Sequence, residues 1–392
     1  MKPVTYFSTL TPLRGIAALL TVIFHVSLMA GPLVNHTQVL SRMYLMVDFF
    51  FVLSGFIMCH VYGDLFSGEV TMPAFKKFTI ARFARVYPLH FITLLYTVIL
   101  FYVSAKLSIP KVPVLQVENS GYTIVTNLLL LQSMNLHHWF SWVHASWSIS
   151  TEWWAYMVFP FLVKPFSKLS SAGKIAVTFL CFGGYLFITF IIIPIVPFPA
   201  EIPFVKIDPN SLSVNVGYQF GFIRCLCGFV LGMMMYQGFK TDWGKKILAN
   251  GYVFLLAVFG LFISMHFGLP DVITIGFLPF VLLSAAYGSP SIIKLFSAKP
   301  LQKLGDWSFS IYLVHQPLLF TIGSIVSYLN PVNPNSQPAS PPPAPGMLMA
   351  WGICVGFIAL TLFVSSLTYR FWEVPARKWI NTKSAKREFA VV

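Results

Sequence analysis

Long apolar runs recur along this 392-residue chain and constrain its fold more than any other feature. Several exceed about 18 residues, the length at which a helix can span the hydrocarbon core of a bilayer. Only 10% of the residues are charged, whereas a soluble domain carries about 25%. Such a chain cannot cover a surface that faces water on all sides. The sequence therefore predicts an all-α integral membrane protein.

Ten segments are long enough to cross the bilayer, so we expect about ten transmembrane helices. They form one domain over residues 1–380, followed by a basic cytoplasmic tail over 381–392. The expected spans are 12–30, 43–62, 86–105, 146–164, 174–196, 217–237, 250–268, 271–288, 308–329 and 347–369. The apolar stretch 121–134 is too short to cross and runs into a polar, aromatic segment. We expect 121–145 to be re-entrant or to lie at the surface.

Lysine and arginine set the direction of the spans, because they concentrate on the cytoplasmic side. With the N-terminus inside, most of the 26 basic residues fall inside as well, which predicts that both termini are cytoplasmic. The net charge of +14 has the same origin. The basic residues punctuate the gaps between spans and form no single arm, which argues against nucleic acid and for contact with anionic membrane lipid.

Cysteine spacing gives no sign of a metal site. Cys225 and Cys227 lack a second pair at the spacing of zinc ligands. We therefore expect no bound metal, and expect the five cysteines to pack as small apolar side chains.

Ionisable residues inside the apolar spans are the first functional candidates, because each costs roughly 2.5–3.5 kcal/mol to insert. They are Arg14, His25, Asp48, Glu152, Arg224 and His315. Arg14 and His25 are separated by eleven positions, which places them on one helix stripe, roughly 16 Å apart along the axis. They are either functional groups or a snorkelling arginine and a hydrogen-bonded core histidine.

The predicted topology puts His25, Asp48 and Glu152 at similar depth, toward the outside. A histidine with a carboxylate partner is a general base, so we expect Asp48 or Glu152 to orient His25. Ser148 precedes Glu152 by four residues and shares its helix face. The alternative for Glu152 is an interfacial carboxylate at a helix start, where the helix dipole favours it.

Other candidates belong to the inner side. Arg82 and Arg85 share a helix face, and guanidinium groups suit phosphates; the alternative is ordinary positive-inside anchoring. His315 lies in the inner half of the ninth predicted span with Tyr312 on the same side. These two either line a cytoplasmic entry or form a packed pair. Arg224 either counters a buried carboxylate or contacts an anionic acceptor.

Taken in order, these motifs resemble the acyltransferase-3 family of multi-span membrane acyltransferases over nearly the whole chain. The motifs are "LRGIAALLTVIFH", "VDFFFVLSGF", "RFAR", "SWSISTE", "SFSIYLVHQPL" and "YRFWEVPARKW". The resemblance implies transfer of an acyl group, usually acetyl, from cytoplasmic acyl-CoA to a hydroxyl of an extracytoplasmic carbohydrate. Exopolysaccharide, lipopolysaccharide and peptidoglycan are typical acceptors, and the bacterial inner membrane is the expected location. It further implies that His25 is the essential catalytic residue and that Arg14, Arg82 and Arg85 are functional.

Together these features suggest a mechanism in which arginines hold the phosphates of acetyl-CoA while its thioester reaches His25. Acyl-CoA is then a substrate, and no permanently bound cofactor is expected. A transient acyl-enzyme on His25 or Ser148 would use the same residues. The alternatives are a transporter, disfavoured by the lack of an inverted repeat, and an acyltransferase for a small molecule or lipid. Acceptor choice would lie in the outer loops 31–42, 106–145, 197–216 and 330–346.

Overall fold

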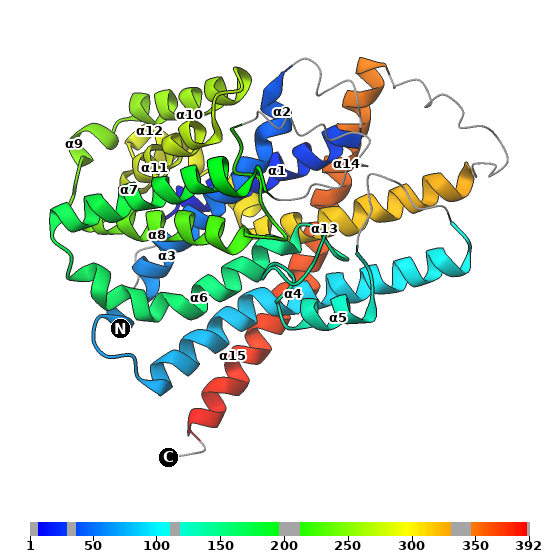
Figure 1. Ribbon diagram of the computed structural model, residues 1–392, viewed down its shortest axis with the longest axis horizontal. Helices are drawn as coiled ribbons and strands as arrows, with labels where there is room; N and C mark the ends of the chain where they lie inside the picture. Colours follow the sequence, from blue (N-terminus) through cyan, green and yellow to red (C-terminus); the bar gives the residue numbers. More distant parts are fainter. Residues whose placement is uncertain (1–6, 30–36, 110–117, 196–211, 331–345, 390–392) are drawn as a thin grey trace.

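The computed structural model describes residues 7–29, 37–109, 118–195, 212–330 and 346–389 (Figure 1). Within these ranges every regular element is a helix, which confirms the predicted all-α class. The proposed acceptor loops 197–216 and 330–346 lie almost entirely outside the described residues, and loops 31–42 and 106–145 lie partly outside them.

The helices are α1 (Leu10–Met29), α2 (Gln38–Arg42), α3 (Met46–Tyr62), α4 (Met72–Lys106), α5 (Gly121–Leu128), α6 (Ser146–Ser167), α7 (Ser171–Phe187), α8 (Gly221–Lys240), α9 (Lys245–Leu248), α10 (Gly251–His266), α11 (Asp271–Tyr287), α12 (Pro290–Phe296), α13 (Lys299–Leu329), α14 (Met347–Thr368) and α15 (Val374–Phe389). A 3₁₀ turn over Met43–Leu45 joins α2 to α3. A π-helical turn over Ile188–Ile192 extends α7, and another over Tyr369–Glu373 joins α14 to α15.

Seven helical stretches among the described residues are long and apolar enough to cross a membrane, or eight if α11 and α12 form one bent span. All ten predicted spans coincide with helices. However, α10 has only 16 residues, α11 meets α12 at 91°, and α6 is not among the seven. The chain is thus a multi-span membrane protein, while the count of ten and the orientation remain predictions.

The segment after α4 forms the short helix α5 and then enters the helix bundle. Helix α5 has eight residues, too few to cross a bilayer. The chain that follows reaches buried side chains: Gln132 Nε2 donates to the Ser146 carbonyl at 3.1 Å, and the Ala145 amide donates to Gln316 Oε1 at 3.0 Å. As a result, the first turns of α6 begin inside the protein, with Ser146, Ser148, Ser150 and Thr151 buried.

Glycines allow two pairs of helices to approach closely. A Cβ on Gly305 of α13 would lie 2.1 Å from the Thr11 carbonyl oxygen of α1, and one on Gly55 of α3 would lie 1.8 Å from the Phe229 carbonyl oxygen of α8. Small residues at such crossings let backbones meet where lipid provides no hydrophobic drive between helices. The α1–α13 crossing holds the polar residues of α1 against α13.

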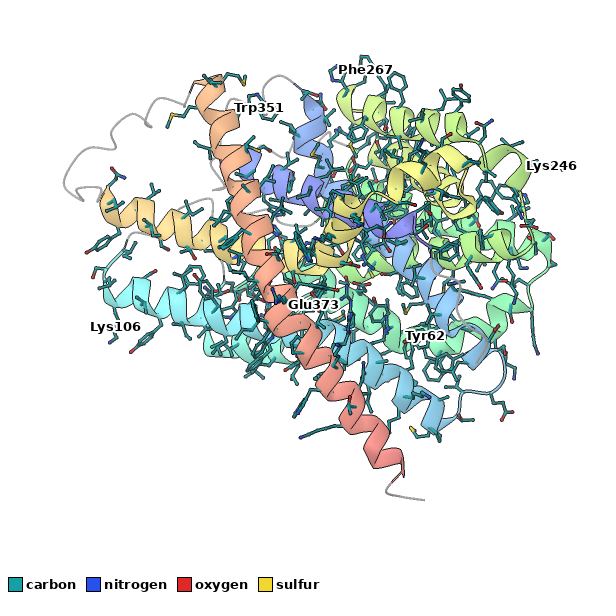
Figure 2. The ribbon with its side chains drawn as sticks, turned by 180° about the vertical axis from the view of Figure 1, so that it is seen from behind. Tyr62, Lys106, Lys246, Phe267, Trp351 and Glu373 are labelled. Carbon is teal, nitrogen blue, oxygen red and sulfur yellow. The ribbon has the colours of Figure 1, made fainter. Side chains whose placement is uncertain are left out.

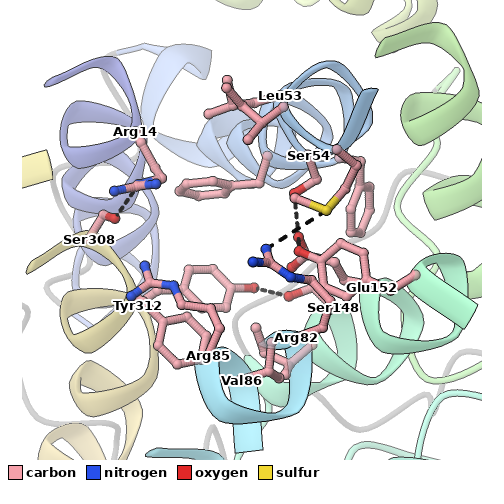
Figure 3. A pocket seen from close by; sticks show the side chains of 17 residues that line it. Arg14, Leu53, Ser54, Arg82, Arg85, Val86, Ser148, Glu152, Ser308 and Tyr312 are labelled. Carbon is pink, nitrogen blue, oxygen red and sulfur yellow. Dashed lines mark hydrogen bonds between the residues drawn. The ribbon is translucent and has the colours of Figure 1, made fainter. Parts of the chain in front are cut away.

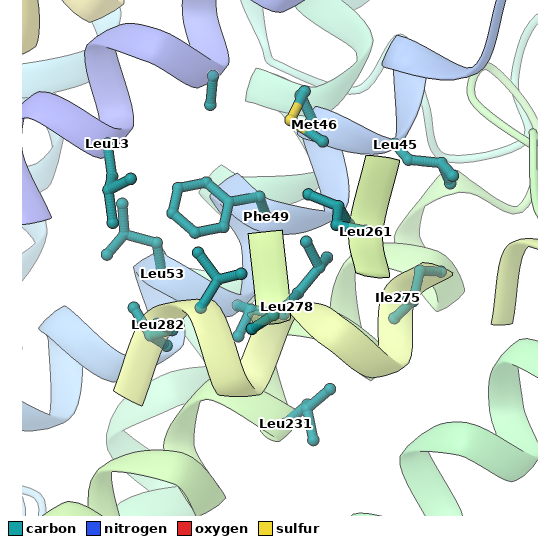
Figure 4. Packing of buried hydrophobic residues seen from close by; sticks show 14 of the residues in the cluster. Leu13, Leu45, Met46, Phe49, Leu53, Leu231, Leu261, Ile275, Leu278 and Leu282 are labelled. Carbon is teal, nitrogen blue, oxygen red and sulfur yellow. The ribbon is translucent and has the colours of Figure 1, made fainter. Parts of the chain in front are cut away.

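Apolar packing surrounds α3 on two faces. Phe49 and Leu53 belong to a cluster with Leu261 of α10 and Leu278 and Leu282 of α11 (Figure 4). The other face of α3 packs in a second cluster through Val47, Phe51 and Met58. The partners in that cluster include Phe78 of α4, Phe159 of α6 and Phe229 of α8. Helix α3 is therefore held firmly between the two clusters. The five cysteines carry free thiols, four of them buried.

Candidate active site

A pocket between α1, α3, α4, α6 and α13 brings together residues that are far apart in sequence (Figure 3). Six of the predicted site residues line it: Arg14, Arg82, Arg85, Ser148, Glu152 and Tyr312. Guanidinium groups come from α1 and α4, and hydroxyl and carboxylate groups come from α6 and α13. The pocket is therefore lined by three arginines and one glutamate, which suits an anionic ligand.

Arg82 contacts the protein through its two terminal nitrogens, and its Nη1 lies 3.8 Å from Met58 Sδ. Its Nη2 donates to the Tyr62 hydroxyl at 2.9 Å, and its guanidinium carbon lies 5.0 Å from the centre of the Tyr62 ring and 5.9 Å from that of Tyr156. Its Nε is buried without a hydrogen-bond partner, and no carboxylate of the described chain is within ion-pair distance. A buried donor without an acceptor is a natural contact for a ligand oxygen.

Arg14 is held by the facing helix. Its Nε donates to Ser308 Oγ at 2.8 Å and its Nη2 to the Gly305 carbonyl at 2.9 Å, both on α13. The guanidinium thus points into the bundle. The snorkelling alternative for Arg14 is wrong, because α1 packs so closely on α13 that this face of the helix is internal.

Arg85 forms an ion pair with Glu373, a carboxylate that the sequence analysis did not identify. Glu373 is 2% exposed and also accepts a hydrogen bond from Ser310 Oγ at 2.9 Å. The Arg85 guanidinium carbon lies 5.2 Å from the centre of the Phe309 ring. Glu373 lies just beyond the predicted span 347–369, so a search for charges inside spans passes over it.

Glu152 lies among the pocket arginines and not beside His25. Its carboxylate accepts hydrogen bonds from the hydroxyls of Ser54 and Tyr156. The expectation that Glu152 orients His25 is therefore wrong. The cause is segment 129–145, which enters the bundle, so that the first turns of α6 are buried in the protein. Ser148, one turn earlier, hydrogen-bonds the Tyr312 hydroxyl at 2.7 Å.

Asp48 is committed to Arg224. The Arg224 Nη2 lies 2.6 Å from Asp48 Oδ2 and its Nε lies 3.1 Å from Oδ1, with both side chains at most 1% exposed. The expectation that Asp48 orients His25 is therefore wrong, and Arg224 counters this buried carboxylate. Arg224 Nη1 also donates to the Val216 carbonyl at 3.2 Å, which anchors the segment before α8.

The partner of His25 is a second histidine. His315 Nε2 lies 3.3 Å from His25 Nδ1. His25 Nδ1 also lies 2.9 Å from the Thr21 carbonyl oxygen, and His315 Nδ1 lies 3.2 Å from that of Ile311. A carbonyl oxygen only accepts, so both rings carry their proton on Nδ1. His315 Nε2 is then an acceptor for His25, and the lone pair of His25 Nε2 is left as a base.

The predicted depths of His25, toward the outside, and of His315, in the inner half of its span, do not both hold, because the two rings are in contact. Helix α13 begins at Lys299, not at 308, so His315 lies near the middle of the helix. The histidine pair does not line the pocket itself. It adjoins the pocket through Tyr312, whose ring centre lies 6.0 Å from that of His315. Ser308, which accepts from Arg14, then Tyr312 and His315 thus follow one another along α13.

The segment that precedes α6 and the segment that precedes α8 pack against each other. Tyr218 contacts Trp139 and Phe140, with ring centres 5.0 and 4.9 Å apart, and Gln219 Nε2 donates to the His137 carbonyl at 3.2 Å. Burial raises the pKa of Tyr218 to about 12 and lowers the pKa of His137. Both groups are neutral near pH 7, so this contact is aromatic and uncharged.

Comparison with known proteins agrees with the architecture. Residues 10–370 match the acyltransferase-3 family model, which is described as an acyltransferase domain. The match covers most of the chain, and the chain belongs to this family. It is therefore a membrane-embedded acyltransferase.

Three relatives share this similarity. The chain is 33% identical over 161 residues to "Protein 2 in picA locus" of Rhizobium radiobacter, covering 38% of this chain and 79% of that protein. It is 26% identical to acyltransferase MdmB of Streptomyces mycarofaciens, covering 78% of this chain and 77% of MdmB. It is 23% identical to the peptidoglycan O-acetyltransferase OatA of Listeria monocytogenes, covering 85% of this chain and 51% of OatA. No solved structure matches the chain.

Proposed function

We propose that this protein is an O-acyltransferase of the bacterial inner membrane that transfers an acetyl group from cytoplasmic acetyl-CoA to a hydroxyl of an extracytoplasmic carbohydrate. The observation that carries the proposal is the order of groups beside α13. Arginines line the pocket, Tyr312 follows on α13, and next to it lies the histidine pair, in which His25 Nε2 is available. A donor with anionic phosphates and a thin, uncharged thioester arm matches this order.

The donor phosphates bind Arg82, Arg14 and Arg85. Of these, Arg82 offers a buried N–H group that has no hydrogen-bond partner in the described chain. The pantetheine arm then passes Tyr312 and Ser148, whose paired hydroxyls line the pocket on the side of the histidines. A hydroxyl at this point can donate to the thioester carbonyl and stabilise the negative charge that develops on its oxygen.

The transfer step uses His25 as a general base. The acceptor hydroxyl gives its proton to His25 Nε2 while its oxygen bonds to the thioester carbonyl carbon. The carbon–sulfur bond then breaks, and the imidazolium returns the proton to the departing sulfur, which yields the ester and free CoA. His315 acts as a positioning residue, because its Nε2 accepts a hydrogen bond from the Nδ1–H of His25 and holds the ring.

The acceptor is assigned to carbohydrate by analogy with OatA, whose name gives it as a peptidoglycan O-acetyltransferase. The direction of transfer follows the charge distribution, since lysine and arginine concentrate in the loops assigned to the cytoplasm. Both termini are then cytoplasmic, the arginine pocket opens inward and the acceptor approaches from outside.

The test compares His25→Ala with His266→Ala in protein reconstituted in lipid nanodiscs. His266 is an exposed histidine at the end of α10 that does not line the pocket, and it serves as a matched control. With acetyl-CoA and a glycan acceptor, we expect thiol release and acetyl transfer from wild type and His266→Ala, and a loss of about 10²–10⁴-fold for His25→Ala. Full transfer by a folded His25→Ala would contradict the role of His25.

Two further measurements test the substrates. A wild-type protein that consumes no acetyl-CoA with any glycan would contradict the proposal and favour transport. Mass spectrometry of surface glycans from cells with and without the gene should show a mass difference of one acetyl group. A difference found only in a lipid or small molecule would overturn the carbohydrate assignment.

A further inference from the structure

We infer that Glu373 is a positioning residue that sets Arg85 for a phosphate of the acyl donor, an inference that rests on the proposed function. One carboxylate oxygen of Glu373 pairs with Arg85 Nη1 and the other accepts from Ser310 Oγ at 2.9 Å. The carboxylate is thus fixed from two helices, α4 and α13. Its ion-pair partner is one of the arginines that line the pocket.

A π-helical turn presents Glu373 to Arg85. The turn spans Tyr369–Glu373, between α14 and α15, and π turns inside helices commonly serve functional sites. Its neighbour Trp372 donates from Nε1 to the Pro88 carbonyl at 2.8 Å, which ties the same turn to α4 a second time. Figure 2 shows Glu373 where the chain from α14 to α15 passes over α4.

The ion pair leaves part of the arginine available. Only Nη1 of Arg85 is bonded to Glu373, so Nη2 and Nε can meet an anion. The arginine side chain is 20% exposed and would sample several rotamers without a partner. A buried carboxylate that selects one rotamer removes that ordering cost from ligand binding.

The carboxylate that lines the pocket, Glu152, has a different role. Glu152 is bonded to two hydroxyls, those of Ser54 and Tyr156, and forms no ion pair with an arginine of the described chain. Glu373 is therefore the carboxylate whose removal should act on the donor through an arginine.

The experiment measures steady-state kinetics of Glu373→Gln with two donors. Glutamine keeps the size of the side chain and an oxygen for Ser310, but removes the charge. With acetyl-CoA we expect KM to rise about 10-fold, the effect of weakening one charge-assisted hydrogen bond, with kcat within about twofold of wild type. With S-acetylpantetheine, which lacks the phosphates, we expect both constants to match those of wild type.

Asp271→Asn is the matched control. Asp271 is a fully buried carboxylate that pairs with the partly exposed Arg42 at 3.0 Å, and neither residue lines the pocket. A general effect of breaking a buried ion pair would appear in both variants. We expect Asp271→Asn to leave the ratio of the two KM values at the wild-type level.

Several results would overturn the inference. One is an equal rise in KM for both donors, and another is a lower kcat at unchanged KM. Should Glu373→Gln not fold, the double variant Arg85→Gln/Glu373→Gln, in which neither partner of the ion pair remains charged, is measured with both donors. We expect its KM to rise for acetyl-CoA and not for S-acetylpantetheine; an equal rise for both donors, or no rise, refutes the inference. Failure of wild type to use either donor contradicts the proposed function instead.

Discussion

His315 offers the sharpest test of how the imidazole of His25 is activated. The Nδ1 proton of His25 has two acceptors: the Thr21 carbonyl oxygen at 2.9 Å and His315 Nε2 at 3.3 Å. In His315→Ala the Thr21 carbonyl still holds that proton on Nδ1, so Nε2 remains the base. The variant loses one long hydrogen bond and part of the stabilisation of the imidazolium. This amounts to about 1–2 kcal/mol, or roughly 5–30-fold in kcat.

The assay is acetyl transfer at saturating acetyl-CoA, with His25→Ala and His315→Gln measured beside His315→Ala. His25→Ala removes the base and should lose about 10²–10⁴-fold. Glutamine carries an oxygen near the position of the histidine Nε2, so His315→Gln should recover most of the activity lost by alanine. The double variant His25→Ala/His315→Ala should be no slower than His25→Ala, because His315 acts through His25.

The reasoning is refuted by either of two outcomes. If His315→Ala is as inactive as His25→Ala, the Thr21 carbonyl is not enough to keep the tautomer, or His315 itself is the base. If His315→Gln is no better than His315→Ala, an acceptor at this position contributes nothing. Circular dichroism and thermal unfolding of each variant separate these outcomes from a loss of folding.

Three other predictions concern stability. Asp48→Asn should lower the free energy of unfolding in detergent by about 3–5 kcal/mol, because it leaves Arg224 buried without its charge partner; an unchanged midpoint in a denaturant titration refutes this. Gly55→Leu should prevent stable folding, whereas Gly276→Leu, where added atoms meet open space, should leave the melting temperature unchanged. Burial lowers the pKa of His137 from its ordinary value of 6.5, so its contribution to stability is present above pH 6.5 and lost on acidification. After correction for intrinsic exchange, the protection of amides in segment 121–145 should therefore fall as the pH drops below about 6, and a protection factor that does not change with pH would contradict this.

The helices could be predicted from the sequence because hydropathy reports the solvent that each span meets. The same signal fails where a helix leaves the lipid. Helix α4 starts at Met72 and α13 at Lys299, well before the predicted 86 and 308, through polar turns that carry no apolar run. These extensions matter for the site, since the one in α4 includes Arg82 and Arg85.

The chemistry-bearing residues of the site could be found, but their partners could not. The insertion cost of a charge identifies Arg14, His25 and Glu152 one at a time. Which side chains can pair depends on their depth in the membrane. The sequence gives that depth only if the loops between spans stay outside the bundle. The entry of segment 129–145 into the bundle breaks that assumption for Glu152. The close α1–α13 crossing at Gly305 likewise brings His315 to His25, and a single sequence contains no signal for that register.

The distribution of charge partners explains why His25 pairs with a neutral group. Asp48, Asp271 and Glu373 are each neutralised by an arginine away from the histidines. In the proposed transfer, negative charge develops on the thioester oxygen and on the departing sulfur beside the imidazole, and a fixed carboxylate there would repel it in a medium of low dielectric. A neutral histidine accepts the hydrogen bond from His25 Nδ1–H without adding negative charge next to the reacting groups. Replacing His315 by Glu should accordingly slow acetyl transfer more than replacing it by Gln, although glutamate is the stronger acceptor; a faster His315→Glu enzyme would refute this electrostatic argument.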